Sequence, residues 1–140
     1  MGPTYRAAFS GNHRNVPLAR NAIASFARIC GFSREEVEDI RLAAGEALNN
    51  AVEHGHARRS NGFSVSCTFC DNEMAIEIHD NGEGFDPERS LEELPSEPRG
   101  RGLGIYLMRR LMDAVRFDRG GTRVRLIRRH AIPDDSTFTV

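Results

Sequence analysis

Glu46 and Asn50 stand one helical turn apart in this 140-residue chain, and their types suit a site for a phosphorylated ligand. They share one helix stripe, which we expect to be separate from the small residues Ala44 and Ala51. An Asn oxygen is a hard ligand suited to Mg²⁺, and a neighbouring Glu can orient or deprotonate a hydroxyl. An ordinary polar helix face would give the same pair.

A second candidate feature is Asp80, which ends an apolar strand-like run and is followed by Gly82 and Gly84. A carboxylate at this place can accept a hydrogen bond from an exocyclic amine such as that of adenine. The two glycines let the backbone turn sharply and approach a ligand closely. An Asx turn between a strand and a loop is the structural alternative.

A third feature is the glycine run Gly100, Gly102 and Gly104, which opens a helix-like segment. Backbone amides at a helix N-terminus bind phosphate oxygens, and Arg99 and Arg101 add positive charge. A hinge with a capping glycine is the alternative. A Rossmann site does not fit, because its glycines follow an early strand in a parallel βαβ unit.

The composition excludes several other kinds of site. All 19 basic residues are Arg, so the lysine that a P-loop or a protein kinase of the usual fold requires is missing. Residues 99–130 hold ten arginines and two acidic residues, a basic surface for phosphate, for an acidic partner or simply for water. Aromatic residues make up 7% and form no stacking series, so we expect no direct binding of nucleic acid.

The cysteines and the hydropathy pattern predict an ordinary cytoplasmic domain. Cys67 and Cys70 are three apart in an alternating strand-like run, which sends their side chains to opposite faces. We therefore expect structural cysteines rather than a zinc or redox pair. No apolar stretch approaches a membrane span, and the N-terminus lacks a signal pattern, so we expect no membrane contact.

Hydrophobic periodicity and turn residues predict one α+β domain. In chain order we expect a strand at 4–10, a helix at 16–29, a helix from the Ser33–Glu36 capping box to about 54, strands at 63–69 and 74–79, a helix at 103–111, and strands at 115–118 and 122–128. Helices on one face of a mixed, mostly antiparallel sheet give a two-layer α/β sandwich. Residues 1–130 form the single domain, and residues 131–140 form a loose tail.

The same periodicity predicts which side chains face the core. The second helix should bury a side rich in small residues, made of Val37, Ile40, Ala44, Ala47, Leu48 and Ala51. The helix at 103–111 should turn inward Leu103, Tyr106, Leu107 and Leu111. In the last strand Val124 and Leu126 should be buried, while Arg123 and Arg125 face water.

Taken in order, these motifs resemble the GHKL ATPase superfamily with its Bergerat nucleotide fold. The order is ExxxN on a helix, DxGxG after a strand, GxGxG before a helix, and Gly121-Thr122 opening a late strand. The resemblance covers roughly residues 5–128. The Glu-Ala-x-x-Asn-Ala core at residues 46–51, followed by His54-Gly55, looks most like small bacterial anti-sigma factor serine kinases of the RsbW type.

The resemblance implies roles for the motif residues. Asn50 would hold the Mg²⁺ that bridges the phosphates of ATP, and Glu46 would be the general base on a substrate hydroxyl. Asp80 would bind the adenine amine. The remaining cofactor-binding set would be Gly82 and Gly84 at the base, Gly102, Leu103 and Gly104 at the phosphates, Arg101 at the phosphate or the partner, and Thr122 closing the adenine pocket. Residues 86–99 would be the ATP lid.

The resemblance also implies a function with two partners. Such proteins are serine/threonine kinases that phosphorylate a STAS-type anti-anti-sigma protein and sequester a sigma factor, and they are commonly dimers through the first strand and helix. Two alternatives stay open. One is a non-catalytic ATP-binding partner-switch module. The other is a detached histidine-kinase catalytic domain, which lacks its acceptor-bearing helical hairpin here.

Overall fold

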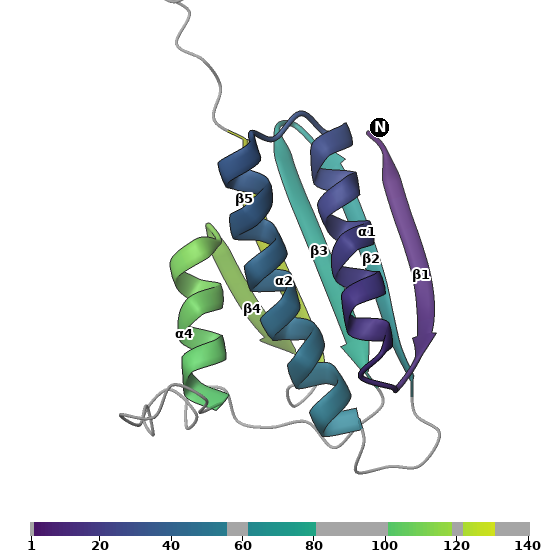
Figure 1. Ribbon diagram of the computed structural model, residues 1–140. Helices are drawn as coiled ribbons and strands as arrows, with labels where there is room; N and C mark the ends of the chain where they lie inside the picture. The colour runs from purple at the N-terminus through teal and green to yellow at the C-terminus, as the bar shows by residue number, and fades with distance from the viewer. Residues whose placement is uncertain (1, 56–61, 81–100, 119–121, 131–140) are drawn as a thin grey trace, which may run out of the picture.

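A computed structural model describes residues 2–55, 62–80, 101–118 and 122–130 of the chain. The elements are β1 (Thr4–Ser10), α1 (Asn15–Ile29), α2 (Arg34–Gly55), β2 (Gly62–Cys70), β3 (Glu73–Asp80), α4 (Arg101–Leu111), β4 (Ala114–Asp118) and β5 (Arg123–Arg129). The five strands form one sheet in the order β1-β2-β3-β5-β4, and every pairing among them is antiparallel. The helices lie on one face of the sheet, with α2 in the middle (Figure 1). The predicted α+β two-layer sandwich is confirmed.

Local chemistry sets the ends of the first two helices as predicted. Gly31 takes a φ of +92°, which ends α1 in the left-handed region. The backbone N–H of Glu36 donates to Ser33 Oγ at 3.1 Å, and the N–H of Ser33 donates to Glu36 Oε1 at 2.9 Å. This reciprocal capping box satisfies two helix-end donors and begins α2 directly after the turn.

A two-residue turn fixes the register of the β2–β3 hairpin. Asp71 and Asn72 both have positive φ, 53° and 62°, which is the conformation that matches the twist of antiparallel strands. Cys70 then pairs with Glu73, and Cys67 pairs with Ile76. Cys67 is buried and Cys70 is exposed, as the alternation predicted. Burial raises the pKa of the Cys67 thiol to about 12, so this thiol stays neutral and structural.

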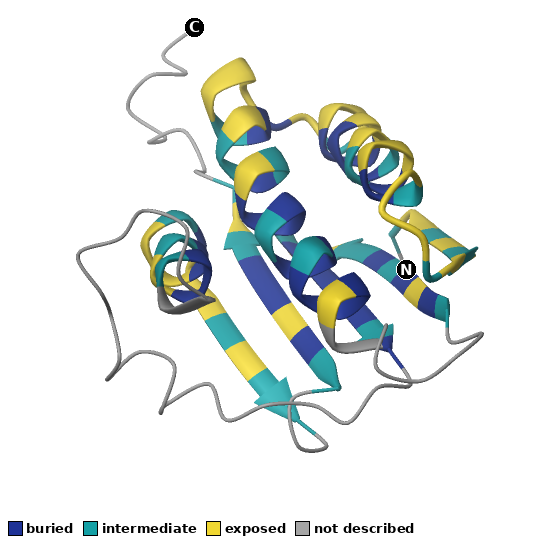
Figure 2. Cartoon of the chain, turned by 60° about the horizontal axis from the view of Figure 1, so that its bottom comes forward, coloured by how far each residue is buried: buried dark blue, intermediate teal, exposed yellow. Residues whose placement is uncertain are grey.

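The core lies between α1, α2 and α4 on one side and the helix-facing side of the sheet on the other. Figure 2 shows the buried stripes of the helices turned toward the strands. All six residues that the periodicity of α2 predicted to be inward are buried. Four of these six are no larger than Val, so α2 packs close to the sheet.

The predicted inward face of α4 is confirmed at Leu111, which packs against the core, and is wrong at Tyr106. Tyr106 is 42% exposed, and Leu107 is only partly buried, whereas Ile105, Met108 and Met112 are buried. The helix carries two apolar stripes at helical spacing, so periodicity alone did not separate them. Gly104 decides between them, because its missing side chain lets α4 approach α2 closely on the side that carries Ile105 and Met108.

Two arginines of β5 form ion pairs with acidic residues of the neighbouring strands. Arg125 faces away from the helices and pairs with Glu77 at 2.9 Å, and Arg123 pairs with Asp118 at 3.1 Å. Val124 and Leu126 are buried on the helix side, as predicted. Within the ranges that the structure describes, no helix is long and apolar enough to cross a membrane.

The rotation of α4 predicts unequal effects of two nearby substitutions. Met108→Ala should lower the free energy of unfolding by about 2–5 kcal/mol, because it leaves a cavity in the core. Tyr106→Ala on the outer side should cost less than about 1 kcal/mol. Urea unfolding of both variants checks this, and a larger loss for Tyr106→Ala would contradict the observed face.

Candidate functional site

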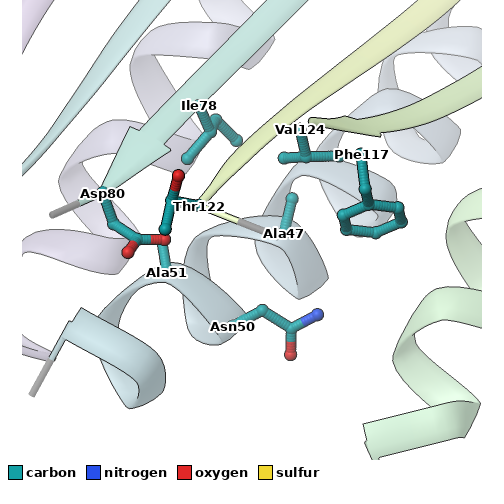
Figure 3. A pocket seen from close by; sticks show the side chains of 8 residues that line it. All are labelled: Ala47, Asn50, Ala51, Ile78, Asp80, Phe117, Thr122 and Val124. Atoms are coloured by element: carbon teal, nitrogen blue, oxygen red, sulfur yellow. The ribbon is translucent and has the colours of Figure 1, made fainter. Parts of the chain in front are cut away.

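A pocket lies where α2 meets the ends of β3, β4 and β5 (Figure 3). Five apolar side chains and three polar ones line it: Ala47, Ala51, Ile78, Phe117, Val124, Asn50, Asp80 and Thr122. The described residues enclose about 10 Å³ here, and their chemistry, apolar walls with a few polar groups, is that of a site for a small organic ligand.

Two polar residues in this pocket are exceptional in their burial. Asp80 is 4% exposed and Asn50 is 8% exposed, and they are the two buried polar or charged side chains among the residues with described burial. Removing such groups from water is unfavourable unless hydrogen bonds compensate. Their placement in one pocket makes this pocket the candidate site for a small polar ligand.

Asp80 is brought beside Thr122 by the pairing of β3 with β5. The backbone N–H of Asp80 donates to the carbonyl of Thr122 at 2.8 Å, which extends the strand ladder by one step beyond His79 and Arg123. The carboxylate of Asp80 and the side chain of Thr122 then stand together at the end of β3 (Figure 3). Two predicted residues that are 42 positions apart are therefore neighbours in the fold.

Asn50 reaches the pocket from α2. Its Nδ2 is buried and has no hydrogen-bond partner among the atoms that the structure describes. The neighbouring Asn49 instead lines a groove on the outer side of α2. The expected separation from the small residues is wrong for Ala51, which lines the pocket together with Asn50. Close packing of α2 on the sheet turns the edge of its polar stripe inward at this point.

Glu46 lies between α2 and the first turn of α4. A Cβ placed on Gly104 would come within 2.7 Å of Glu46 Oε2, so the carboxylate packs directly against the helix backbone at Gly104. Burial, reinforced by the like charge of Glu53, raises the pKa of Glu46 above its ordinary value. Glu46 also borders the outer groove with Arg20, Gly45 and Asn49 and does not line the Asn50 pocket.

The first turn of α4 contains the predicted phosphate-binding glycines. The helix begins at Arg101, two residues earlier than the sequence suggested, so Gly102, Leu103 and Gly104 are already helical. The first four N–H groups of a helix have no partner within it, and they carry the positive end of its dipole. This turn can therefore offer backbone donors to an anion beside Glu46.

Several predicted site residues lie outside the described part of the chain. These are Gly82 and Gly84 of the DxGxG motif, together with Arg99, Gly100 and Gly121. The side chain of Arg101 is also outside the description, although its backbone begins α4. Among the side chains that are described, no group of three or more His, Cys, Asp or Glu gathers as a metal site.

The apolar walls of the pocket could not be predicted from the sequence. Phe117 on β4 and Ile78 on β3 line it with Val124. The alternation of the last strand identified Val124 as a core position, but it gave no sign that the core opens into a pocket there. Phe117 had no signal at all, because its role depends on β4 lying at the edge of the sheet beside β5.

An open-sided sandwich with a buried Asp at a strand end, a buried Asn on the central helix and a glycine-bearing helix start defines a nucleotide-binding domain. A family described as the histidine kinase-like ATPase domain matches residues 9–128, and this chain belongs to that family. Family membership implies that the chain binds ATP. The predicted resemblance to GHKL proteins is confirmed.

Two relatives illustrate the similarity. The chain is 34% identical over 112 residues to the serine-protein kinase RsbW of Oceanobacillus iheyensis. This alignment covers 74% of this chain and 71% of that protein. It is 30% identical over 134 residues to the anti-sigma F factor of Clostridium acetobutylicum. This second alignment covers 91% of this chain and 94% of that protein.

A solved structure shares the fold. The crystal structure of the RsbU and RsbW domains of a Mycobacterium tuberculosis protein matches 94% of this chain with a TM-score of 0.67 at 18% identity. This chain spans about a third of that longer chain, 33% of its length. The match supports the architecture of the sandwich.

The pocket predicts the effect of neutralising Asp80. Asp80→Asn should weaken ATP binding at least about tenfold, because hydrogen bonds to charged groups contribute about 1.5–3 kcal/mol. Glu77→Gln, on the same strand but on the face opposite the helices, is the control and should bind ATP like the wild type. Calorimetry measures both, and equal affinities for the two variants would contradict the role of Asp80.

Proposed function

We propose that this protein is an ATP-dependent serine/threonine protein kinase that also acts as an anti-sigma factor. It phosphorylates a STAS-type anti-anti-sigma partner and sequesters a sigma factor. The names of the two relatives support this proposal. The observation that carries it is that buried Asn50 and Asp80 line one pocket, while Glu46 of α2 packs against the first turn of α4.

The pocket has the chemistry of an adenine site. The Asp80 carboxylate accepts a hydrogen bond from the exocyclic amine, and Thr122 lies beside it. Ala47, Ala51 and Ile78 supply apolar walls for the flat faces of the base. Gly82 and Gly84 complete the base-binding set by analogy with the family motif.

The residues at the phosphate end fit a magnesium–triphosphate group. Asn50 offers an amide oxygen, and its buried Nδ2, which has no partner among the described atoms, fits a side chain whose contacts come from a ligand. Mg²⁺ takes few protein ligands and keeps several waters, so one Asn suffices as its protein contact. When bound, the ion neutralises phosphate charge. Backbone amides of Gly102, Leu103 and Gly104 and the charge of Arg101 bind the phosphate oxygens.

Glu46 is the general base of the proposed reaction. Its raised pKa makes the carboxylate a stronger proton acceptor than an ordinary surface Glu. Its contact with Gly104 holds it next to the phosphate-binding turn of α4. The carboxylate accepts the proton of the partner's hydroxyl while that oxygen attacks the γ-phosphorus, and ADP leaves.

In this proposal, residues 1–130 act as a single domain, and the protein forms a homodimer through β1 and α1. Leu18 and Ile29 on α1 are 61% and 76% exposed, which supplies apolar surface for such a contact. Light scattering tests this part of the proposal, and a monomer at micromolar concentration contradicts it.

Transfer of label from γ-labelled ATP to a STAS protein encoded nearby tests the activity. The wild type should transfer phosphate to a Ser or Thr. Glu46→Gln should keep ATP binding and lose about 100-fold or more in rate, the usual contribution of a general base. Asn50→Ala should lose transfer, whereas Asn49→Ala is the adjacent control and should retain it.

Three results would count against the proposal. Full activity in Asn50→Ala contradicts the site assignment. ATP binding and partner control without any transfer would instead identify a non-catalytic switch module. An acid-labile phosphohistidine on the partner would indicate a histidine-kinase catalytic domain.

The pKa of Glu46 predicts a pH effect of its neighbour. The acid limb of the transfer rate follows deprotonation of Glu46, and the like charge of Glu53 contributes to raising that pKa. Glu53→Gln should therefore move the acid limb toward lower pH. Glu38→Gln, which lines the same groove as Glu46, is the control and should leave the limb in place. A pH–rate profile of each variant decides, and a shift toward higher pH contradicts the assignment.

A further inference from the structure

Arg128 on β5 points toward the helices, although its strand neighbours on that side are apolar. Val124 and Leu126 share this face and are buried, and the Arg128 side chain is 20% exposed. A guanidinium in such a place must be held by several hydrogen bonds to offset its lost hydration. The groups that the guanidinium contacts therefore indicate the role of Arg128.

The guanidinium joins three elements of the fold. Nη1 donates to the carbonyl of Leu111, the last residue of α4, and Nη2 pairs with Asp39 Oδ2 of α2 at 3.3 Å. A cation at a helix C-terminus also interacts favourably with the helix dipole. The planar fork of Arg can contact both groups at once, which the single ammonium of Lys does less well.

Further bonds fix the same end of α4 to β5. The N–H of Asp113 donates to the carbonyl of Ile127 at 2.8 Å, and Asp113 Oδ2 accepts from the N–H of Arg129 at 2.7 Å. Met112 is buried beside them. The distal end of α4 is thus tied to the sheet, and Arg128 is the group that also ties it to α2.

The opposite end of α4 carries the phosphate-binding turn. The helix has 11 residues and spans about 16 Å, short enough to move as one rigid rod. At that end Gly104 packs against Glu46 of α2. Anything that sets the position of α4 relative to α2 therefore sets both the amides for phosphate and the contact that holds Glu46.

We propose that Arg128 is a positioning residue that holds α4 against α2 and so aligns the phosphate-binding turn with Glu46. The inference rests on the proposed function for the meaning of that alignment. In the proposed function, adenosine would contact only the pocket lined by α2, β3, β4 and β5, whereas the phosphates of ATP would also need the first turn of α4. Arg128 should consequently matter for the phosphates and for transfer, and not for the base.

The test compares adenosine with ATP in Arg128→Gln and Arg128→Lys. In Arg128→Gln, the preference for ATP over adenosine should fall about tenfold, the size of a lost charge-assisted hydrogen bond, with adenosine affinity unchanged. Arg128→Lys should restore part of that preference. Arg125→Gln is the matched control, since it removes an ion pair of the same strand on the opposite face. Hydrogen exchange of residues 101–111 should rise in Arg128→Gln and stay unchanged in Arg125→Gln.

Each other outcome overturns the inference. Equal loss of adenosine and ATP affinity would give Arg128 a merely structural role, and an unchanged preference with unchanged exchange would give it none. If Arg128→Gln does not fold, Asp39→Ala removes one partner and should show the same preference loss and exchange. Failure of wild-type phosphate transfer would contradict the proposed kinase, while the binding ratio and the exchange of α4 still decide the role of Arg128.

Discussion

Close packing of one stripe of α2 against the sheet is the constraint on which the rest of the molecule depends. The stripe is made largely of small side chains, including Ala44, Ala47 and Ala51, so the helix axis can approach the strands. That approach brings Asn50 into the pocket that Asp80 enters from the end of β3. A bulkier stripe would lift α2 and separate the two polar groups.

The same packing explains why the site is polar inside an apolar core. Asn50 and Asp80 are buried where hydrophobic side chains would give more stability, and such exceptions to core chemistry concentrate at functional sites. Gly104 is a comparable exception in α4, since it gives up helix propensity to let Glu46 pack against the backbone. Each of these residues lowers the stability of its own segment, and together they form the candidate site between two helices and a sheet.

Much of the fold could be predicted because its signals are local. The Ser33–Glu36 capping box and the opposite faces of Cys67 and Cys70 each depend on a few consecutive residues, and each was confirmed. The inward face of α4 was wrong at Tyr106 because two apolar stripes compete, and only the neighbours of the helix choose between them. Roles of the candidate site residues stay predictions, although the fold brings Asn50, Asp80 and Thr122 together.

The sequence by itself determined the order of the elements and the family motifs, because periodicity and spacing are properties of the chain. Only the tertiary structure decided that Thr122 lies against Asp80, that Phe117 closes the pocket and that Arg128 bridges α2 and α4. These contacts join segments far apart in the chain. Their geometry follows from strand pairing and helix packing, which no local pattern encodes.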